Sequence, residues 1–329
     1  MIFSNFDCNM MRRALQLAAN GVGATSPNPM VGAVITHGDR IIGEGWHRRF
    51  GGPHAEVNAV RSVPPELEHL IPESTIYVTL EPCSHFGKTP PCANLIVEKQ
   101  FKRVVVGATD PNPKVAGRGI ERIRQAGIQV DTGLLEKECY NLNIKFMTAH
   151  TLHRPYVTLK WAQSTDGFMD DDRALTGLPH RFSNHITAAT AHRLRALNDA
   201  IAVGARTYIV DNPSLTTRLY EGRDAKRILF DGHKIVEPDD SWIHINDNEP
   251  LADVLTRFYS QHGITSILVE GGASVLRRFI EADIWDEARV EVQPVTLGNS
   301  GRTPAPVIDA VPRSSECVAG NTLFFYTRR

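Results

Sequence analysis

The sequence predicts two consecutive domains of the α/β class, divided near residue 150. The chain has 329 residues, which exceeds one typical compact domain and suits two. Helical and strand patterns alternate along the first half, and the alternation restarts after Arg154-Pro155, where a proline ends a helical pattern. The strand runs are apolar and therefore indicate buried sheets with helices packed on them.

The elements of the first half follow from the spacing of apolar residues and from glycine and proline signals. Helical spacing over residues 7–20 ends at Gly21, and the helix before Gly127 closes in the same way. A helix is also expected to follow Pro90-Pro91. The expected helices are 7–20, 54–61, 93–99, 119–127 and 135–154, and the expected strands are 31–36, 40–46, 75–80 and 103–108.

The second half repeats this alternation of strands and helices. The expected strands are 156–162, 199–204, 227–231, 266–272, 288–292 and 322–327, and the expected helices are 187–197, 250–261 and 273–282. The acidic run 170–173 lies in a polar stretch that is typical of a loop.

Composition excludes several classes of protein. With 36 basic and 37 acidic residues and a net charge of −1, the chain has no surface suited to coating a nucleic acid. No apolar run reaches the ~18 residues of a membrane span. The five cysteines are few and odd in number, and no secretory signal pattern opens the sequence. We therefore expect a cytoplasmic, reducing location, which argues against a disulfide between Cys83 and Cys92.

One constellation indicates a metal site. His54, Cys83 and Cys92 supply three ligand types that zinc prefers, whereas a structural zinc closes with four protein ligands. The open position suits a water whose pKa zinc lowers to ~7, and Glu56 is spaced to carry its proton. This arrangement resembles the H-x-E and P-C pattern of zinc-dependent base deaminases, with a longer gap between the cysteines. Two alternatives stay open: buried cysteines without metal, and a structural zinc with His85 as its fourth ligand.

The residues around this constellation resemble a known family. PNPMVGAVI, GEGWH, GGPHAEVNA, TLEPCSHFGKTPPC and DPNPKVAGRGI are similar to the deaminase domain of bifunctional riboflavin-biosynthesis deaminase/reductases, over residues 5–150. The resemblance implies a cytidine-deaminase-like α/β/α sandwich, Zn²⁺ on His54, Cys83 and Cys92, and Glu56 as the proton shuttle. It also implies substrate contacts at Asn28, His47, His85, Lys88 and Asn112. Without the family, the two asparagines would indicate Asn-Pro turns and Lys88 a solvated loop residue.

The second half lacks a G-x-G-x-x-G fingerprint after a strand. VEGGASVLRRF instead places two glycines between a strand and a helix, an arrangement that can cradle a phosphate but is also common in packing. LKWAQSTDG, HRLRALNDAIAVGARTYIVDNPSLTTR, ILVEGGASVL and PVTLG resemble the reductase domain of the same family, which is similar to dihydrofolate reductase. The resemblance implies NADPH contacts at Ala162, His185, Thr207, Asp211, Gly232, Gly272, Ala273, Ser274, Val275 and Leu276, and substrate contacts at Ser183, Arg195, Leu215, Arg218 and Glu270.

Three features depart from the pattern of the reductase domain. The stretch between Gly167 and Ser183 is longer than usual and acidic, Phe168 replaces a frequent basic residue, and His185 replaces a common tryptophan. These departures concern the loop that would face the cofactor. No residue of this half stands out as a general acid, so we expect binding and hydride geometry to dominate.

Together these observations predict a bifunctional enzyme. Residues 1–150 would form a zinc-dependent pyrimidine deaminase domain acting on 2,5-diamino-6-(5-phosphoribosylamino)pyrimidin-4-one, and residues 151–329 an NADPH-dependent reductase domain that converts the ribosyl group to ribityl. We expect a small phosphoribosyl pyrimidine as substrate, no nucleic acid, no membrane, and a homo-oligomer, either a dimer or a tetramer. Two alternatives are a monofunctional deaminase with a C-terminal ligand-binding or docking module, and a zinc-stabilised binding protein without activity.

Overall fold

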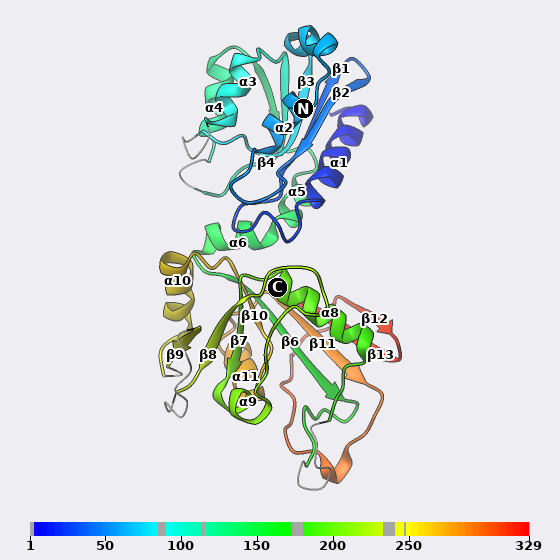
Figure 1. Ribbon diagram of the computed structural model, residues 1–329, viewed down its shortest axis with the longest axis vertical. Helices are drawn as coiled ribbons and strands as arrows, with labels where there is room; N and C mark the ends of the chain where they lie inside the picture. Colours follow the sequence, from blue (N-terminus) through cyan, green and yellow to red (C-terminus); the bar gives the residue numbers. More distant parts are fainter. Residues whose placement is uncertain are drawn as a thin grey trace. The chain divides into compact units, whose positions relative to one another are not determined.

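The computed structural model describes residues 3–84, 90–112, 116–172, 180–232, 241–246 and 248–328. The chain divides into two compact units, Met1–Leu152 and His153–Arg329 (Figure 1). None of the helices among these residues has the length and apolar character needed to cross a membrane.

The first unit is built on a five-stranded sheet in the order β2-β1-β3-β4-β5. β1 runs antiparallel to β2 and β3, whereas β3, β4 and β5 are parallel. The strands are β1 (Gly32–His37), β2 (Arg40–Trp46), β3 (Thr75–Leu80), β4 (Arg103–Ala108) and β5 (Gln129–Thr132). The helices are α1 (Asn5–Ala19), α2 (Ala55–Arg61), α3 (Cys92–Glu98), α4 (Arg118–Gln125), α5 (Glu136–Leu142) and α6 (Ile144–Leu152), with the 3₁₀ helix η1 (Pro65–Glu73).

Helices cover both faces of this sheet, as expected for an α/β/α sandwich (Figure 1). One face packs on apolar residues of α2, α3 and α4, such as Ala59, Ile96 and Ile123. The other packs on α1, α5 and α6 through residues such as Met11 and Cys139. The sandwich fixes α2 and α3, the two helices whose first turns carry predicted site residues, on the same face of the sheet.

The expectation of a single helix over residues 135–154 is wrong. The structure has α5 and α6 with a break at Asn143, where φ is −112°. The Asn143 side chain donates to the Met30 carbonyl and accepts from the Met30 amide, both at 2.8 Å. A long-range contact therefore interrupts a locally helical pattern. The pattern also missed β5, a short strand with polar residues at both ends.

The second unit contains an eight-stranded sheet in the order β12-β13-β11-β6-β10-β7-β8-β9. The pairs from β11 to β9 are parallel, and β13 is antiparallel to β11 and β12. The strands are β6 (Tyr156–Ser164), β7 (Ala200–Gly204), β8 (Lys226–Phe230), β9 (Trp242–Ile245), β10 (Ser266–Val269), β11 (Glu287–Gln293), β12 (Ser314–Val318) and β13 (Asn321–Thr327). The helices are α8 (His185–Ala196), α9 (Ala205–Asp211), α10 (Leu251–His262) and α11 (Ala273–Glu281), with the 3₁₀ turn η2 (Gly298–Ser300).

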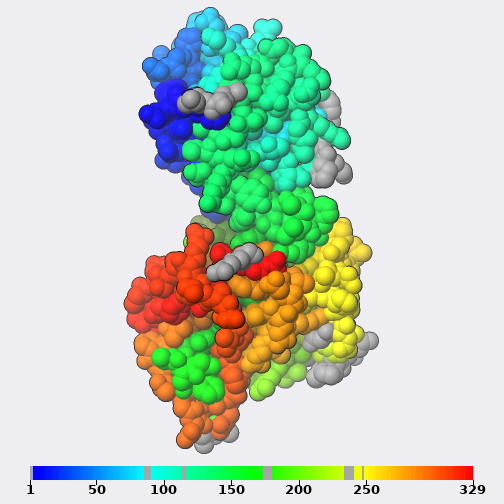
Figure 2. Space-filling view, turned by 180° about the vertical axis from the view of Figure 1, so that it is seen from behind, coloured from blue at the N-terminus to red at the C-terminus, as the bar shows by residue number. Residues whose placement is uncertain are grey.

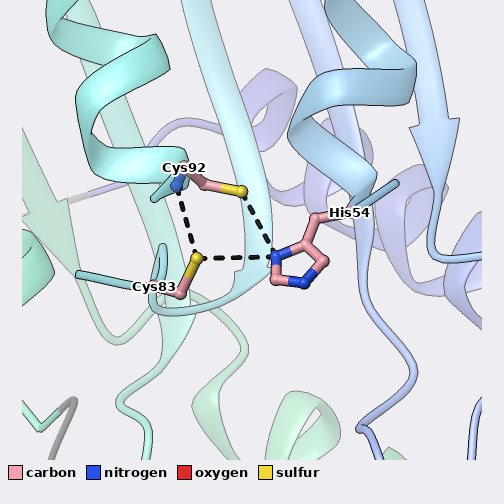
Figure 3. Close-up of side chains that lie close together, drawn as sticks. All are labelled: His54, Cys83 and Cys92. Atoms are coloured by element: carbon pink, nitrogen blue, oxygen red, sulfur yellow. Dashed lines mark hydrogen bonds between the residues drawn. The ribbon is translucent and has the colours of Figure 1, made fainter. Parts of the chain in front are cut away.

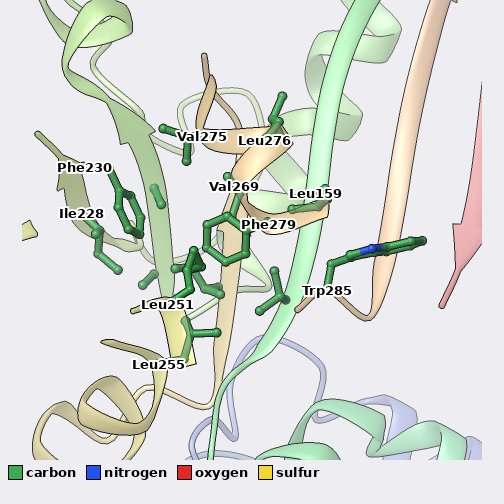
Figure 4. Packing of buried hydrophobic residues seen from close by; sticks show 14 of the residues in the cluster. Leu159, Ile228, Phe230, Leu251, Leu255, Val269, Val275, Leu276, Phe279 and Trp285 are labelled. Atoms are coloured by element: carbon green, nitrogen blue, oxygen red, sulfur yellow. The ribbon is translucent and has the colours of Figure 1, made fainter. Parts of the chain in front are cut away.

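The main core of this unit lies between the sheet and helices α10 and α11. Phe230, Leu255, Val269, Phe279 and Trp285 are among its buried side chains (Figure 4). A smaller cluster on the opposite face joins the sheet to Leu194 of α8 and Tyr208 of α9. The strand β12 is largely exposed, and the hairpin that it forms with β13 lies on the outer surface of the unit (red in Figure 2). The sequence patterns missed α9, β9 and β12.

Candidate active sites

The three predicted metal ligands lie together at the carboxyl end of β3. His54 is the residue that precedes α2, Cys92 begins α3, and Cys83 follows β3. The His54 Nδ1 atom lies 3.5 Å from Cys83 Sγ and 3.4 Å from Cys92 Sγ (Figure 3). The three donor atoms all lie within 4.8 Å of one another.

The donor set fits zinc in both spacing and chemistry. A tetrahedral zinc with bonds of 2.0–2.3 Å holds its ligand atoms about 3.5 Å apart, which matches the two distances from His54 Nδ1 to the sulfur atoms. Hydrogen bonds from the Cys92 thiol, His54 and the Cys92 amide lower the pKa of Cys83 to about 4, even though burial opposes this. The pKa of Cys92 is raised by its hydrogen bond with Cys83 and by burial, since the two sulfurs compete for one proton. The cluster thus holds one thiolate already, and a cation would stabilise the second.

Glu56 lies in the first turn of α2 and is 3% exposed. Burial, and then the charge of Cys83, raise its pKa to about 6. Its carboxyl also forms a hydrogen bond with the Cys92 side chain, which works in the opposite direction. A carboxyl with a pKa close to neutrality can both accept and release a proton at physiological pH, as an acid/base catalyst must.

Asn28 and His47 extend the site on the other side of His54. The Asn28 amide nitrogen lies 3.3 Å from His47 Nε2, and His47 Nδ1 lies 3.0 Å from the Pro53 carbonyl oxygen. The His47 and His54 rings meet edge to face at 5.4 Å. Burial lowers the pKa of His47, and the charge of His54 lowers it further. The neutral ring therefore donates through Nδ1 to Pro53 and accepts from Asn28 through Nε2.

The other predicted deaminase contacts divide into two groups. Asn112 is half-buried, and its backbone amide donates to Asp110 Oδ1 at 2.8 Å. His85 and Lys88 lie outside the described residues. The structure therefore brings Asn28, His47 and Glu56 to the cysteine and histidine cluster.

In the second unit, an ion pair joins two predicted substrate contacts. Arg195 Nη2 lies 2.6 Å from Glu270 Oε2, and Arg195 Nε donates to Glu270 Oε1 at 3.0 Å. Arg195 Nη1 also donates to the Thr216 carbonyl. Arg218, by contrast, is exposed and bonds only hydroxyl groups among the described residues, those of Ser214 and Thr216. The charge of Arg195 is therefore paired with Glu270, whereas the guanidinium of Arg218 forms no ion pair with a described residue and could bind an anionic ligand.

Two further predicted substrate contacts have partners of their own. Ser183 Oγ donates to Glu291 Oε2 at 2.6 Å. Leu215 is 4% exposed and packs in the core cluster that contains Leu194 of α8.

Among the predicted cofactor contacts, Thr207 lies beside the turn between β10 and α11. Gly272 has φ +69°, and a Cβ there would lie 3.3 Å from the Thr207 hydroxyl oxygen. The residues Ala273, Ser274, Val275 and Leu276 form the first turn of α11 directly after it. The remaining predicted contacts come from several elements: Ala162 from β6, His185 from the start of α8, Asp211 from the end of α9 and Gly232 from the loop after β8.

Each of the two units matches a known protein family. The cytidine and deoxycytidylate deaminase zinc-binding region matches residues 4–108, and the RibD C-terminal domain matches residues 155–311. The riboflavin biosynthesis protein RibD of Aquifex aeolicus is 36% identical over 321 residues, which cover 89% of this chain and 88% of that protein. The chain belongs to the RibD family.

Solved structures of this family have the same fold. RibD of Acinetobacter baumannii superposes with a TM-score of 0.86 at 30% identity, covering 98% of each chain. A diaminohydroxyphosphoribosylaminopyrimidine deaminase/5-amino-6-(5-phosphoribosylamino)uracil reductase of Thermotoga maritima gives 0.84 at 35% identity, covering 97% of this chain and 98% of that one.

Membership of the RibD family confirms several predictions. The fold is a cytidine-deaminase-like domain followed by a dihydrofolate-reductase-like domain. The chain is a bifunctional deaminase and reductase, and the monofunctional alternative is wrong. Its cofactors are Zn²⁺ and NADPH.

The structure gives a physical account of one departure from the RibD pattern. The backbone of Phe168 pairs with that of Pro304, and the Phe168 ring lies over Gly301, where a Cβ would come within 2.4 Å of the ring. The loop after β6 is therefore tied to residues 300–305 by an aromatic side chain where a basic residue is frequent. Seven residues of this loop, 173–179, lie outside the described ranges.

The sequence analysis did not select Lys160, which lies on β6 beside the reductase residues. In the register of β6 and β10, Leu159 pairs with Val269, the last residue of β10, so Lys160 and Glu270 each directly follow this pair. Lys160 is half-buried, and its ammonium has no hydrogen bond or ion pair to any described residue. A lysine within the apolar run YVTLKWA was the available sequence signal.

Proposed function

We propose that the first unit deaminates 2,5-diamino-6-(5-phosphoribosylamino)pyrimidin-4-one and that His54, Cys83 and Cys92 hold its zinc ion. The observation that carries this proposal is the convergence of three zinc-type donor atoms within 4.8 Å, beside a buried carboxyl. The named activity of the Thermotoga maritima relative supports the choice of substrate.

The roles of the protein groups follow from their positions. Zinc, when bound, supplies an activated water at neutral pH. Glu56 would take the proton of that water and pass it to the departing amino nitrogen, and ammonia would leave. Asn28 and His47 would hold the pyrimidine ring, because their side chains form a hydrogen-bonded pair beside His54. His85, Lys88 and Asn112 remain predicted substrate contacts.

For the second unit, we propose NADPH-dependent reduction of 5-amino-6-(5-phosphoribosylamino)uracil to the ribityl product. NADPH supplies the hydride. The turn Gly272 to Leu276, with Ala162, His185, Thr207, Asp211 and Gly232, would hold the cofactor.

Arg218 would bind the substrate phosphate, since its guanidinium is exposed and forms no ion pair within the described residues. Arg195 would orient Glu270 toward the sugar, and Ser183 and Leu215 would complete the site. Lys160 is our choice for the proton donor, because it directly follows Leu159, which pairs with the residue before Glu270.

Location and assembly are also proposals. A cytoplasmic location is supported by the five cysteines, none of which forms a disulfide. A homo-oligomer, dimer or tetramer, stays a prediction that light scattering would check.

The substitution Glu56→Gln tests the proposed deaminase mechanism. It keeps the size of the side chain and removes the proton acceptor, so we expect ammonia release to fall by about 10²–10⁴-fold. Zinc content, measured by atomic absorption, should stay at one ion per chain. NADPH oxidation with the deaminated substrate should be unchanged in the same preparation and serves as the internal control. Ammonia release at the wild-type rate would contradict the role of Glu56.

A further inference from the structure

Glu81 is a buried carboxylate that has no role in the deaminase mechanism proposed above. It follows β3 directly, two residues before Cys83, and is 4% exposed. Its partners among the described residues are all backbone amides. Oε2 accepts from Asp110 at 3.4 Å and Gly117 at 3.0 Å. Oε1 accepts from Gly119 at 3.1 Å and Ile120 at 3.4 Å.

These four amides belong to both ends of one loop. Asp110 lies on the side that leaves β4, whereas Gly117, Gly119 and Ile120 lie where α4 begins. Asp110 in turn accepts from the Asn112 amide at 2.8 Å, and the Ala116 amide donates to the Asn112 carbonyl at 2.8 Å. One carboxylate thus holds the two ends of the loop that carries Asn112.

The same junction ties the loop to the strand that leads to Cys83. A Cβ at Gly119 would lie 1.9 Å from the Pro82 carbonyl oxygen, so α4 can start this close to Pro82 only with glycine. A cavity of about 570 Å³ opens beside this junction and is lined by Ser84, Ala116 and Gly117, among others. The held loop therefore borders open space directly after Cys83.

We propose that Glu81 is a positioning residue for deaminase substrate binding. By accepting hydrogen bonds from four backbone amides, it sets the position of the loop between β4 and α4, which carries Asn112, relative to Cys83. This inference rests on the proposed function, because Asn112 contacts substrate only in that proposal. A carboxylate suits the role because it is acceptor-only and can serve several N–H donors at once. A glutamine of the same size would turn an N–H donor toward amides that need an acceptor.

The test is Glu81→Gln in the full chain. Loss of charged hydrogen bonds predicts that KM for the diaminopyrimidine substrate rises by about tenfold to a hundredfold. The deaminase kcat and the zinc content should stay within about threefold, in keeping with a KM-type loss of binding. The control Asp131→Asn removes another buried carboxylate of this unit, one that pairs with Arg103, and should leave KM unchanged.

A glycine pair gives a second, milder test. Gly117 and Gly127 flank α4 with φ of +74° and +82°, and a Cβ at either would meet open space. Alanine should therefore strain both positions equally, but only Gly117→Ala displaces an amide held by Glu81 and should raise KM. Equal KM values for Gly117→Ala and Gly127→Ala would overturn the proposal.

A double-mutant cycle identifies the route of the effect. If Glu81 acts through the loop, Glu81→Gln should add little to KM in an Asn112→Ala background. Fully additive effects, loss of zinc, or a fall in kcat at constant KM would overturn the inference. A wild-type chain that releases no ammonia would instead refute the proposed function itself, so the two failures are distinguishable.

Discussion

The two candidate active sites are assembled in different ways. The deaminase site takes its metal ligands and Glu56 from the starts of two helices and the end of one strand, and it is organised by burial and shared protons. The predicted reductase site takes its residues from strands, helices and loops spread over the second unit, and ion pairs and hydrogen bonds such as Arg195–Glu270 and Ser183–Glu291 join them. The comparison indicates that the first site depends on one buried cluster of donor atoms, whereas the second depends on separate side-chain pairs.

The largest expected effect is the loss of one activity while the other is kept. Cys83→Ser removes a thiolate ligand, so zinc content should fall and ammonia release should drop by about a thousandfold or more. NADPH oxidation should continue at the wild-type rate, because its residues lie in the other unit. Cys8→Ser, a half-buried cysteine of the same unit, is the control and should keep both activities. Parallel loss of both activities would show that the sites are not independent.

A smaller effect is expected from the ion pair of the reductase site. Arg195→Lys replaces a two-point contact with Glu270 by a single ammonium, so KM for the reductase substrate should rise by about tenfold to a hundredfold. Arg193→Lys, an exposed position on the same helix, should leave KM unchanged. Steady-state NADPH oxidation measures the KM of both variants. Identical KM values in the two variants would argue against a positioning role for Arg195.

The smallest functional effect is expected at Asp7, which is buried in the first unit away from the predicted site residues. Burial tends to raise its pKa, but hydrogen bonds from Ser4, Arg103 and Tyr77 outweigh this and lower it to about 2. A depressed carboxyl pKa stabilises the fold above the unfolded value of 3.8, and the contribution is lost as the pH falls toward 2.

Asp7→Asn should therefore reduce the free energy of unfolding at pH 7 by about 2 kcal/mol. Denaturant unfolding of the variant and the wild type should converge as the pH falls below 2, while KM values for both substrates stay unchanged. A difference that does not shrink as the pH falls through 2 would show that hydrogen-bond geometry, and not ionisation, carries the effect.

Much of the deaminase site could be predicted from sequence because its signals are local. H-x-E at a helix start and P-C after a strand each lie within a few residues, so their spacing indicates candidate ligands and selects Glu56 as the candidate proton carrier. The reductase site gave weaker signals, since an isolated arginine or a Gly-Gly turn occurs in many structures. Lys160 was missed for the same reason: its neighbours lie on other strands.

The sequence by itself determined the α/β alternation and most strands and helices, and it indicated His54, Cys83, Cys92 and Glu56 as candidate site residues, because each signal depends on residues close in the chain. The tertiary structure alone decided the contacts between distant segments. These include the Asn143–Met30 contact that divides α5 from α6, the pairing of Arg195 with Glu270, and the four amides around Glu81. Such contacts depend on strand order and register, which bring together residues that no local pattern relates.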